Sequence, residues 1–212
     1  MKNSTLLFDL DGTLVDTISL YEIACLQILR EYGAEVPLEK FQGWYMSGLH
    51  TKQIAELCGL SEDIVPELRK RRDDLYMQML ATETTWLPGA EDVLKAAKKK
   101  GPVGIVTGSW KSYLDAMRPR TNIYPYAGAI VTADDMHDFM KPHPHGLLLC
   151  ADRLGVDPTT CVYIGDQAFD IEAANAAGMV SVLFRGKHTP ENAEKGATHV
   201  CDTLEGIREF FP

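Results

Sequence analysis

Four short runs of branched, aliphatic and aromatic residues most tightly constrain the fold of this chain, because each is apolar on both faces. They span residues 5–8, 103–106, 161–164 and 180–184. Strands with two buried faces belong inside parallel sheets, where helices cover both sides. Amphipathic helical patterns do lie between the later runs, and the last of them is closed by Gly178. The sequence therefore predicts an open α/β sheet with right-handed crossovers.

One long stretch without strands interrupts this alternation. After the first run, the chain is expected to stay helical from about Asp16 to about Leu80, with apolar residues spaced to cover one face of each helix. A bundle of roughly four helices would bury these faces against one another. We therefore expect an α/β core domain from residues 1–15 and 84–212, and an inserted helical domain from residues 16–83.

Composition excludes several classes of partner. The chain has 212 residues and a formal net charge of -9, whereas a nucleic-acid-binding surface needs clustered Lys and Arg. Its five widely spaced cysteines fit reduced core thiols rather than a disulfide framework, which indicates a cytoplasmic setting. No apolar run approaches membrane-spanning length, and Asp9 and Asp11 interrupt the N-terminal apolar segment, unlike a secretory signal. We expect neither nucleic acid nor a membrane as a partner.

Asp9 and Asp11 follow the first run, where an α/β sheet places its active site. Gly12 permits a sharp turn, so both acids could face one crevice. One carboxylate could attack a phosphoryl group, which divides a difficult hydrolysis into two easier displacements. The other could protonate the leaving oxygen and then deprotonate water. Alone, however, the pair fits a solvated strand end and an Asp-Gly turn equally well.

Two further polar signals follow later strands or precede helices. Thr107, Gly108 and Ser109 come directly after the run at 103–106, and their hydroxyl and amide groups could bind phosphate oxygens. The same tripeptide is also typical of an ordinary capped helix entry. Lys141, before a proline, could supply a cation to the nucleophile and the transferring phosphoryl group. Taken in isolation, it could equally be a surface lysine.

Asp166 and Asp170 form the last signal, at the end of the run at 161–164. If a helix has begun there, the two acids lie one turn apart and can reach one cation. Hard oxygen ligands without nearby Cys or His suit Mg²⁺, and Asp9 with the backbone carbonyl of Asp11 would complete the protein's ligands. Asp170 could bind through water, hold the lysine of the preceding signal, or simply cap the helix.

In this order, the four signals resemble the motifs of the haloacid dehalogenase-like (HAD) hydrolase superfamily. The resemblance spans Leu7 to Gly178. The chain is similar in overall look to phosphoglycolate phosphatase-like and β-phosphoglucomutase-like members. This implies a Rossmann-like core with an inserted α-helical cap of the first type. It also implies a magnesium-dependent phosphoric monoester hydrolase that acts on a small phosphorylated metabolite through an aspartyl-phosphate, as a monomer or homodimer.

The resemblance also implies a role for each motif residue. Asp9 would be the nucleophile and Asp11 the general acid and base. Thr107 and Lys141 would stabilise the phosphate and its charge, with Gly108 and Ser109 as phosphate-binding residues. The implied metal ligands are carboxylates and one backbone carbonyl from Asp9, Asp11, Asp166 and Asp170.

The best candidates for substrate selection within the helical insertion lie in residues 43–52. Similar family members use this loop and helix start to contact the leaving group, which implies substrate-binding roles for His50 and Lys52. Solvated positions are the alternative for these two residues. Trp44 and Tyr45 are better explained by packing between cap helices.

Asp11 and His50 help to distinguish a phosphatase from other activities that occur on the same scaffold. In the dehalogenases, the position of Asp11 is not an aspartate, so this residue favours phosphoryl chemistry. A phosphomutase would keep every core motif and return the phosphoryl group to a sugar, but the loose match around His50 favours hydrolysis. A non-catalytic protein on this scaffold would usually lack one of the acids, and here all of them are present.

Overall fold

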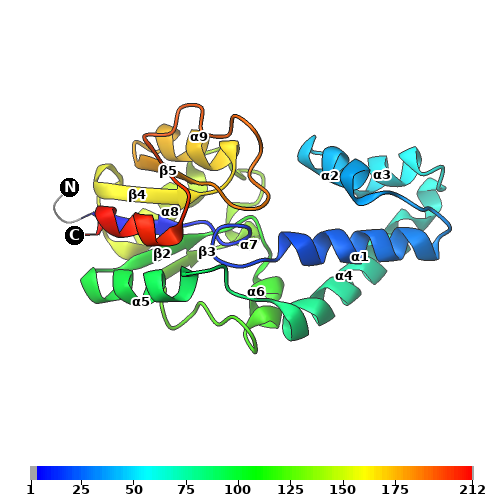
Figure 1. Ribbon diagram of the computed structural model, residues 1–212, viewed down its shortest axis with the longest axis horizontal. Coiled ribbons are helices and arrows are strands. Elements are labelled where there is room, and N and C mark those ends of the chain that lie inside the picture. The colour runs from blue at the N-terminus through cyan, green and yellow to red at the C-terminus, as the bar shows by residue number, and fades with distance from the viewer. Residues whose placement is uncertain (1–3, 212) are drawn as a thin grey trace.

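The computed structural model describes residues 4–211 and contains the predicted parallel α/β sheet (Figure 1). Six parallel strands follow the order β3-β2-β1-β4-β5-β6. Their bounds are β1 Thr5–Phe8, β2 Val103–Val106, β3 Ala129–Val131, β4 Cys161–Gly165, β5 Val180–Phe184 and β6 His199–Cys201. The four predicted runs are the inner strands, and the two edge strands, β3 and β6, were not predicted.

Helices cover both faces of this sheet and extend beyond one end of it. The α-helices are α1 Ile18–Glu31, α2 Leu38–Met46, α3 Thr51–Leu57, α4 Val65–Glu83, α5 Ala90–Lys100, α6 Lys111–Met117, α7 Ala133–Met136, α8 His145–Leu154 and α9 Ala168–Ala176. Short 3₁₀ helices are η1 Glu62–Ile64, η2 Pro158–Thr160 and η3 Leu204–Phe210. Helices α8 and α9 pack on one face of the sheet, and α5 with η3 on the other.

Strand β1 illustrates why the sheet is buried on both faces. Leu6 and Phe8 belong to the apolar cluster that includes residues of α5 and η3, whereas Leu7 belongs to the cluster that includes residues of α8 and α9. None of the three is more than 2% exposed. The continuous apolar run is therefore required, because alternate side chains enter different cores.

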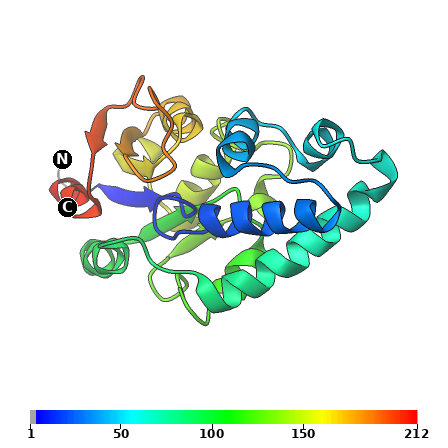
Figure 2. The same cartoon turned by 45° about the vertical axis from the view of Figure 1, so that its right-hand side comes forward.

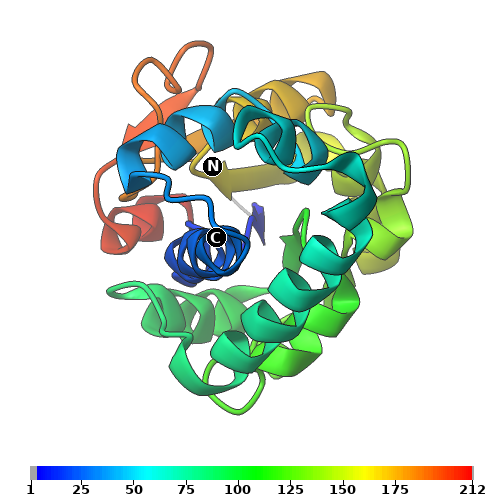
Figure 3. The same ribbon diagram turned by 90° about the vertical axis from the view of Figure 1, so that its right-hand side faces the viewer.

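Helices α1 to α4 lie beyond the carboxyl ends of the strands (Figures 1 and 2). The view from the helical end shows α2 and α3 on one side of α1 and α4 on another (Figure 3). Part of this segment forms an apolar cluster of its own, with buried members Cys25, Ile28, Leu29, Ala34, Phe41, Ile54 and Leu68. Other buried residues of α1 and α4 belong to the cluster that includes β1, α5 and η3, namely Leu20, Ala24, Tyr76, Met79 and Leu80. The apolar helical faces expected from the sequence are therefore buried partly against one another and partly, for α1 and α4, against the core of the sheet.

Two adjacent chain segments connect these helices to the sheet. The backbone N–H of Asp16 donates to the carbonyl of Thr85 at 3.1 Å, and that of Leu87 donates to the carbonyl of Leu14 at 2.9 Å. The outgoing and returning segments are thus hydrogen-bonded to each other immediately after β1. This pairing fixes the base of the helical segment beside the end of the strand that carries Asp9.

The five cysteines are free thiols, and four of them are buried, in agreement with the predicted reduced core positions. Within residues 4–211, none of the helices combines the length and the apolar character needed to cross a membrane.

Candidate active site

Asp9 and the turn after it form the centre of the site. Asp9 is 4% exposed, and its backbone N–H donates to the carbonyl of Ile164 at 2.8 Å, which ties the residue to β4. Gly12 then adopts a φ of +82°, and a Cβ there would lie 2.8 Å from Oδ2 of Asp166. Only glycine combines this backbone conformation with so close an approach. The predicted turn at Gly12 is present and packs directly against a second acidic residue.

The carboxylate of Asp11 is held by hydroxyl groups on both sides. Thr107 donates to Oδ2 and Thr17 donates to Oδ1, each at 2.6 Å. The Oγ1 of Thr107 also accepts from the backbone N–H of Ser109 at 3.0 Å. Thr107 therefore contacts the site through Asp11, and Thr17 makes no side-chain cap of α1. Two hydroxyl groups therefore fix the orientation of the Asp11 carboxyl group.

Lys141 lies between two acids and is not the surface residue that its sequence alone allowed. Its Nζ is 2.6 Å from Oδ1 of Asp9 and 2.6 Å from Oδ1 of Asp170, and it donates to the hydroxyl of Tyr163 at 3.0 Å. The side chain is only 4% exposed. Burial alone would lower the pKa of Lys141, but the charges of Asp170 and Asp9 raise it well above the ordinary value.

Asp170 combines two of the roles that the sequence left open. Its Oδ2 accepts from the backbone N–H of Gln167 at 3.0 Å and so caps the start of α9. Its Oδ1 accepts from Lys141 and lies 3.2 Å from the Tyr163 hydroxyl. Asp170 therefore holds the lysine while it fixes the helix start. Tyr163 was not predicted, because it lies within an apolar strand run and its hydroxyl meets the site only in the folded sheet.

Asp166 is fully buried and accepts from two neighbours that the sequence analysis gave no role. Thr13 donates to its Oδ1 at 2.9 Å, and the side-chain amide of Gln167 donates to its Oδ2 at 2.6 Å. Burial and the nearby charge of Asp170 nevertheless raise the pKa of Asp166 to about 7. The hydrogen bonds orient this carboxylate but do not compensate its charge.

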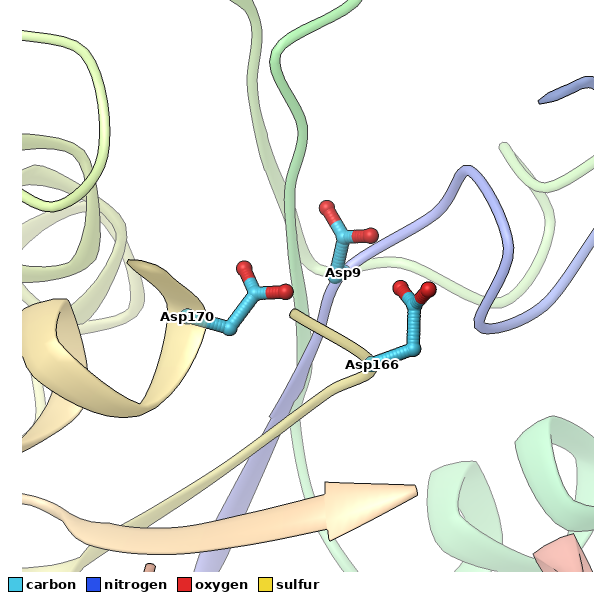
Figure 4. Close-up of side chains that lie close together, drawn as sticks. All are labelled: Asp9, Asp166 and Asp170. Carbon is cyan, nitrogen blue, oxygen red and sulfur yellow. The ribbon is translucent and has the colours of Figure 1, made fainter. Parts of the chain in front are cut away.

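The donor set fits a hard divalent cation. Ligand oxygens of Asp9, Asp166 and Asp170 all lie within 4.8 Å of one another, and Figure 4 shows these carboxylates gathered around a common space. Burial raises the pKa of Asp9 well above its ordinary value even though Lys141 opposes this shift. Three buried acids thus face one lysine, and the excess negative charge is what a cation would neutralise. Carboxylate oxygens without nearby thiol or imidazole ligands suit Mg²⁺.

A cleft opens from these acids toward the helical segment. One part of about 520 Å³ is lined by Asp9, Asp11, Lys141, Gly108 and His50, among others. A second part of about 660 Å³ extends among α1, α3, α4 and α6. The two parts share seven lining residues, namely Asp11, Ile18, Tyr45, Leu49, His50, Gly108 and Met140. They are therefore regions of one continuous cleft.

The predicted phosphate- and substrate-binding residues do not all reach this cleft. Gly108 and His50 line both parts, and Ser109 lines the larger part. Lys52 lines neither part, and its Nζ instead pairs with Glu62 at 2.5 Å on the exposed surface. Position 52 thus lies on the face of α3 that meets η1, and the substrate-binding role of Lys52 stays a prediction.

Acids and a lysine gathered at the carboxyl edge of a parallel sheet define an α/β enzyme. A family model described as "Haloacid dehalogenase-like hydrolase" matches residues 6–184. The chain belongs to this family of hydrolases. The family that the motifs indicated is thereby confirmed.

Relatives and solved structures agree with this assignment. Fructose-1-phosphate phosphatase YqaB of Escherichia coli is 34% identical over 183 residues, covering 85% of this chain and 95% of that protein. Phosphoglycolate phosphatase of the same organism is 32% identical over 199 residues, covering 82% of this chain and 78% of that protein. The crystal structure of CbbY from Rhodobacter sphaeroides in complex with phosphate has a TM-score of 0.80 at 21% identity, over 96% of both chains. The last comparison shows the fold alone.

Proposed function

We propose that this chain is a magnesium-dependent phosphatase that hydrolyses a small phosphorylated metabolite through an aspartyl-phosphate on Asp9. One observation carries the proposal: the buried Nζ of Lys141 lies 2.6 Å from Oδ1 of Asp9 at the floor of the cleft. A buried carboxylate beside a fixed cation and beneath a cleft is placed to attack an incoming anion. The phosphatase names of the two curated relatives support the same reaction.

The two oxygens of Asp9 have different surroundings, which suits nucleophilic attack. Oδ1 accepts from Lys141, whereas the one side-chain hydrogen bond to Oδ2 from within residues 4–211 is a long 3.5 Å contact from Thr13. Lys141 would offset the repulsion between Asp9 and a phosphoryl group, while Oδ2 keeps a lone pair for the phosphorus atom. Gly108 and Ser109 line the cleft, and the backbone amide of Gly108 and the hydroxyl of Ser109 are proposed to receive the phosphoryl oxygens, because the amide of Ser109 already donates to Thr107.

Asp11 is proposed to move the proton. Thr17 and Thr107 fix its carboxylate, and it lines both parts of the cleft, so it can reach the leaving oxygen of a substrate held at Asp9. It would protonate that oxygen in the first displacement and take a proton from water in the second. A residue that serves both steps must return to its starting protonation state, which hydrolysis of the aspartyl-phosphate accomplishes.

Mg²⁺ would be held by Asp9 and Asp166, with the backbone carbonyl of Asp11 and with Asp170 as a further acid at the site. When bound, it would neutralise charge on the phosphoryl oxygens. Asp170 would keep Lys141 in place, and Thr13 and Gln167 would orient Asp166.

Residues 16–83 are proposed to form a cap domain on a core of residues 1–15 and 84–212. The separate apolar cluster of α1 to α4 and the paired connecting segments support this division. A domain above the cleft would exclude water and contact the leaving group.

Release of phosphate from p-nitrophenyl phosphate tests this function. We expect turnover that requires Mg²⁺, is lost with a chelator, and is abolished by Asp9→Asn, with the circular dichroism spectrum unchanged. Asp152→Asn, which changes an exposed acid on α8, is the matched control and should keep its activity. Wild-type turnover by Asp9→Asn would remove the assigned nucleophile.

The phosphomutase alternative receives less support, because both curated relatives described above are named phosphatases. A coupled assay that detects conversion of a hexose 1-phosphate into the 6-phosphate separates the two reactions. We expect free phosphate and no 6-phosphate.

A further inference from the structure

The larger part of the cleft determines what can be attached to the phosphoryl group. It begins at Asp11 and extends among the helices to Arg72 and Asp73 on α4. Because it is continuous with the part that contains Asp9, a leaving group bonded to a phosphoryl group there would occupy it. The residues at the end of the cleft that lies away from Asp11, here called the far wall, therefore determine which leaving groups can bind.

Arg72 lies in this far wall, and its positive charge is already paired with the carboxylate of Asp73. Its side chain is 11% exposed, and Nε and Nη2 donate to Oδ1 of Asp73 at 2.9 and 2.6 Å. Nη1 donates to the hydroxyls of Tyr21 at 2.8 Å and Thr51 at 2.7 Å. These contacts use four of the five N–H donors of the guanidinium. One donor is left.

Asp73 has a carboxylate oxygen that can still accept a hydrogen bond. Its Oδ1 also accepts from the hydroxyl of Tyr113 at 3.0 Å, whereas no side chain among residues 4–211 donates a hydrogen bond to its Oδ2. The side chain is 37% exposed, and Asp73 is one of the residues that line the cleft. The far wall thus offers a ligand one N–H donor and one carboxylate oxygen, from a pair whose net charge is zero.

An anionic leaving group fits this wall poorly. A carboxylate or second phosphate could recruit Arg72 only by competing with Asp73, and it would then lie beside an acid deprived of its partner. Arg69 also lines the cleft but is exposed, so water and salt would screen its attraction for an anion. The wall lacks the desolvated, unpaired cation that strong recognition of a second anion requires.

An uncharged leaving group with several hydroxyls fits much better. One hydroxyl can donate to Oδ2 of Asp73 and another can accept the remaining N–H of Arg72. The rings of Tyr21 and Tyr45, with centroids 5.5 Å apart, both line the cleft and offer apolar surfaces to the carbon skeleton. Sites of this kind combine apolar walls with a few placed polar groups.

We propose that the wall formed by Tyr21, Thr51, Arg72, Asp73 and Tyr113 selects substrates whose leaving group is an uncharged polyol, that is, monophosphates of sugars or sugar alcohols. This inference rests on the proposed phosphatase function. It ranks such substrates above phosphorylated carboxylic acids and bisphosphates.

The test compares kcat/KM for fructose 1-phosphate and phosphoglycolate, with p-nitrophenyl phosphate as a reference for the reaction itself. We expect wild-type protein to prefer fructose 1-phosphate by at least about tenfold, the size of one good hydrogen bond to a charged group. Asp73→Asn removes the negative charge and releases Arg72. We expect this variant to reverse or abolish the preference by lowering kcat/KM for the sugar phosphate and raising it for phosphoglycolate.

Two matched variants complete the experiment. Asp74→Asn changes the adjacent acid, which pairs with Lys70 on the surface and does not line this part of the cleft, so the preference should stay as in wild type. Tyr113→Phe deletes one hydroxyl contact to Asp73 and should weaken the preference even if Asp73→Asn fails to fold.

The outcomes separate this inference from the function on which it rests. Hydrolysis of p-nitrophenyl phosphate with a wild-type preference for phosphoglycolate would overturn the inference and leave the phosphatase function standing. An equal loss for both substrates in Asp73→Asn would also overturn it. If wild-type protein hydrolyses none of the three compounds, the proposed phosphatase function itself is contradicted. In that case, calorimetry can still measure how tightly fructose 1-phosphate and phosphoglycolate bind to the Asp9→Asn protein. The proposed selectivity predicts that fructose 1-phosphate binds more tightly.

Discussion

The ammonium of Lys141 and the carboxylate of Asp9 are separated by 132 positions in the chain yet lie 2.6 Å apart in the buried floor of the cleft. The sheet creates this contact, because the loop that carries Lys141 returns to the carboxyl end of β1, which Asp9 directly follows. A second contact to Asp170 holds the ammonium from the other side.

The first prediction concerns this cation. Lys141→Met should lower kcat for p-nitrophenyl phosphate by roughly a hundredfold to a thousandfold, the usual cost of losing one group that stabilises the developing charge. It should also destabilise the metal-free protein by about 3–5 kcal/mol, because it leaves buried acids without their partner. Urea unfolding measures the second effect. Lys111→Met removes an exposed ion pair and is the control. Equal behaviour of the two variants would contradict the role of Lys141.

The second prediction concerns the charge of Asp166. Its folded-state pKa of about 7 lies above the unfolded value, so the folded protein binds the extra proton and loses stability as pH rises through about 7. Asp166→Asn removes this penalty. Without Mg²⁺, we expect the variant to unfold at a higher temperature than wild type at a pH of about 8, with a smaller difference at a pH of about 6.

Adding Mg²⁺ to the same two proteins tests whether Asp166 is a metal ligand. It should raise the melting temperature of wild type but not of Asp166→Asn, because the variant has lost a charged ligand. Activity should disappear in the same variant. A metal-free Asp166→Asn protein that melts below wild type at the higher pH would show that the buried charge is compensated by another group.

The third prediction separates the two tasks of Asp11. p-Nitrophenolate leaves without protonation, whereas a sugar alkoxide does not, so Asp11→Asn should block the first displacement only for the sugar phosphate. Rapid mixing with p-nitrophenyl phosphate should then release one equivalent of nitrophenol per protein, followed by slow turnover. Thr17→Val, which removes one of the donors to Asp11, should have a milder effect. A loss of equal size for both substrates, without a burst, would rule out proton transfer by Asp11.

The fourth prediction concerns His188, which joins the core to α1. Its ring lies 3.1 Å from the hydroxyl of Ser19, and it is near Asp16 and Glu22. Burial lowers the pKa of His188, although Glu22 opposes the shift and Lys187 adds to it. The unfolded chain therefore binds the proton more readily, and the stability contributed by neutral His188 is lost as pH falls below about 6.5.

Replacement of this histidine measures that contribution. Between pH values of about 7.5 and 5.5, the free energy of unfolding should fall less for His188→Gln than for wild type. His143→Gln alters an exposed histidine and should follow wild type. The same pH dependence in all three proteins would contradict the assignment.

Much of the fold could be predicted because its inner strands have an unusual composition. β1, β2, β4 and β5 are buried on both faces, so their sequences are apolar without alternation. The edge strands β3 and β6 have three residues each and meet only one neighbouring strand. Runs so short do not differ from ordinary loop sequence, and their pairing depends on a sheet that is already formed.

The residues of the site also divide into those that the sequence indicates and those that only the structure reveals. Asp9, Asp11, Lys141 and Asp166 occupy strand ends and loops, where polar residues after apolar runs are conspicuous, and Asp170 follows Asp166 in the first turn of α9. Their partners Thr13, Thr17, Tyr163 and Gln167 carry no such signal, because each gains its role from a contact made after folding. The position of Lys52 away from the cleft lining could not be predicted, because sequence position does not tell which face of α3 meets the cleft.

The central claim is that the phosphoryl group passes through Asp9. The most direct measurement is rapid acid quench of Asp11→Asn protein during its reaction with p-nitrophenyl phosphate, followed by proteolysis and mass spectrometry. We expect one phosphoryl group per chain, located on the peptide that contains Asp9 and absent from the Asp9→Asn, Asp11→Asn double variant. A phosphoryl group on another peptide, or full turnover with no phosphorylated protein at any time, would contradict it.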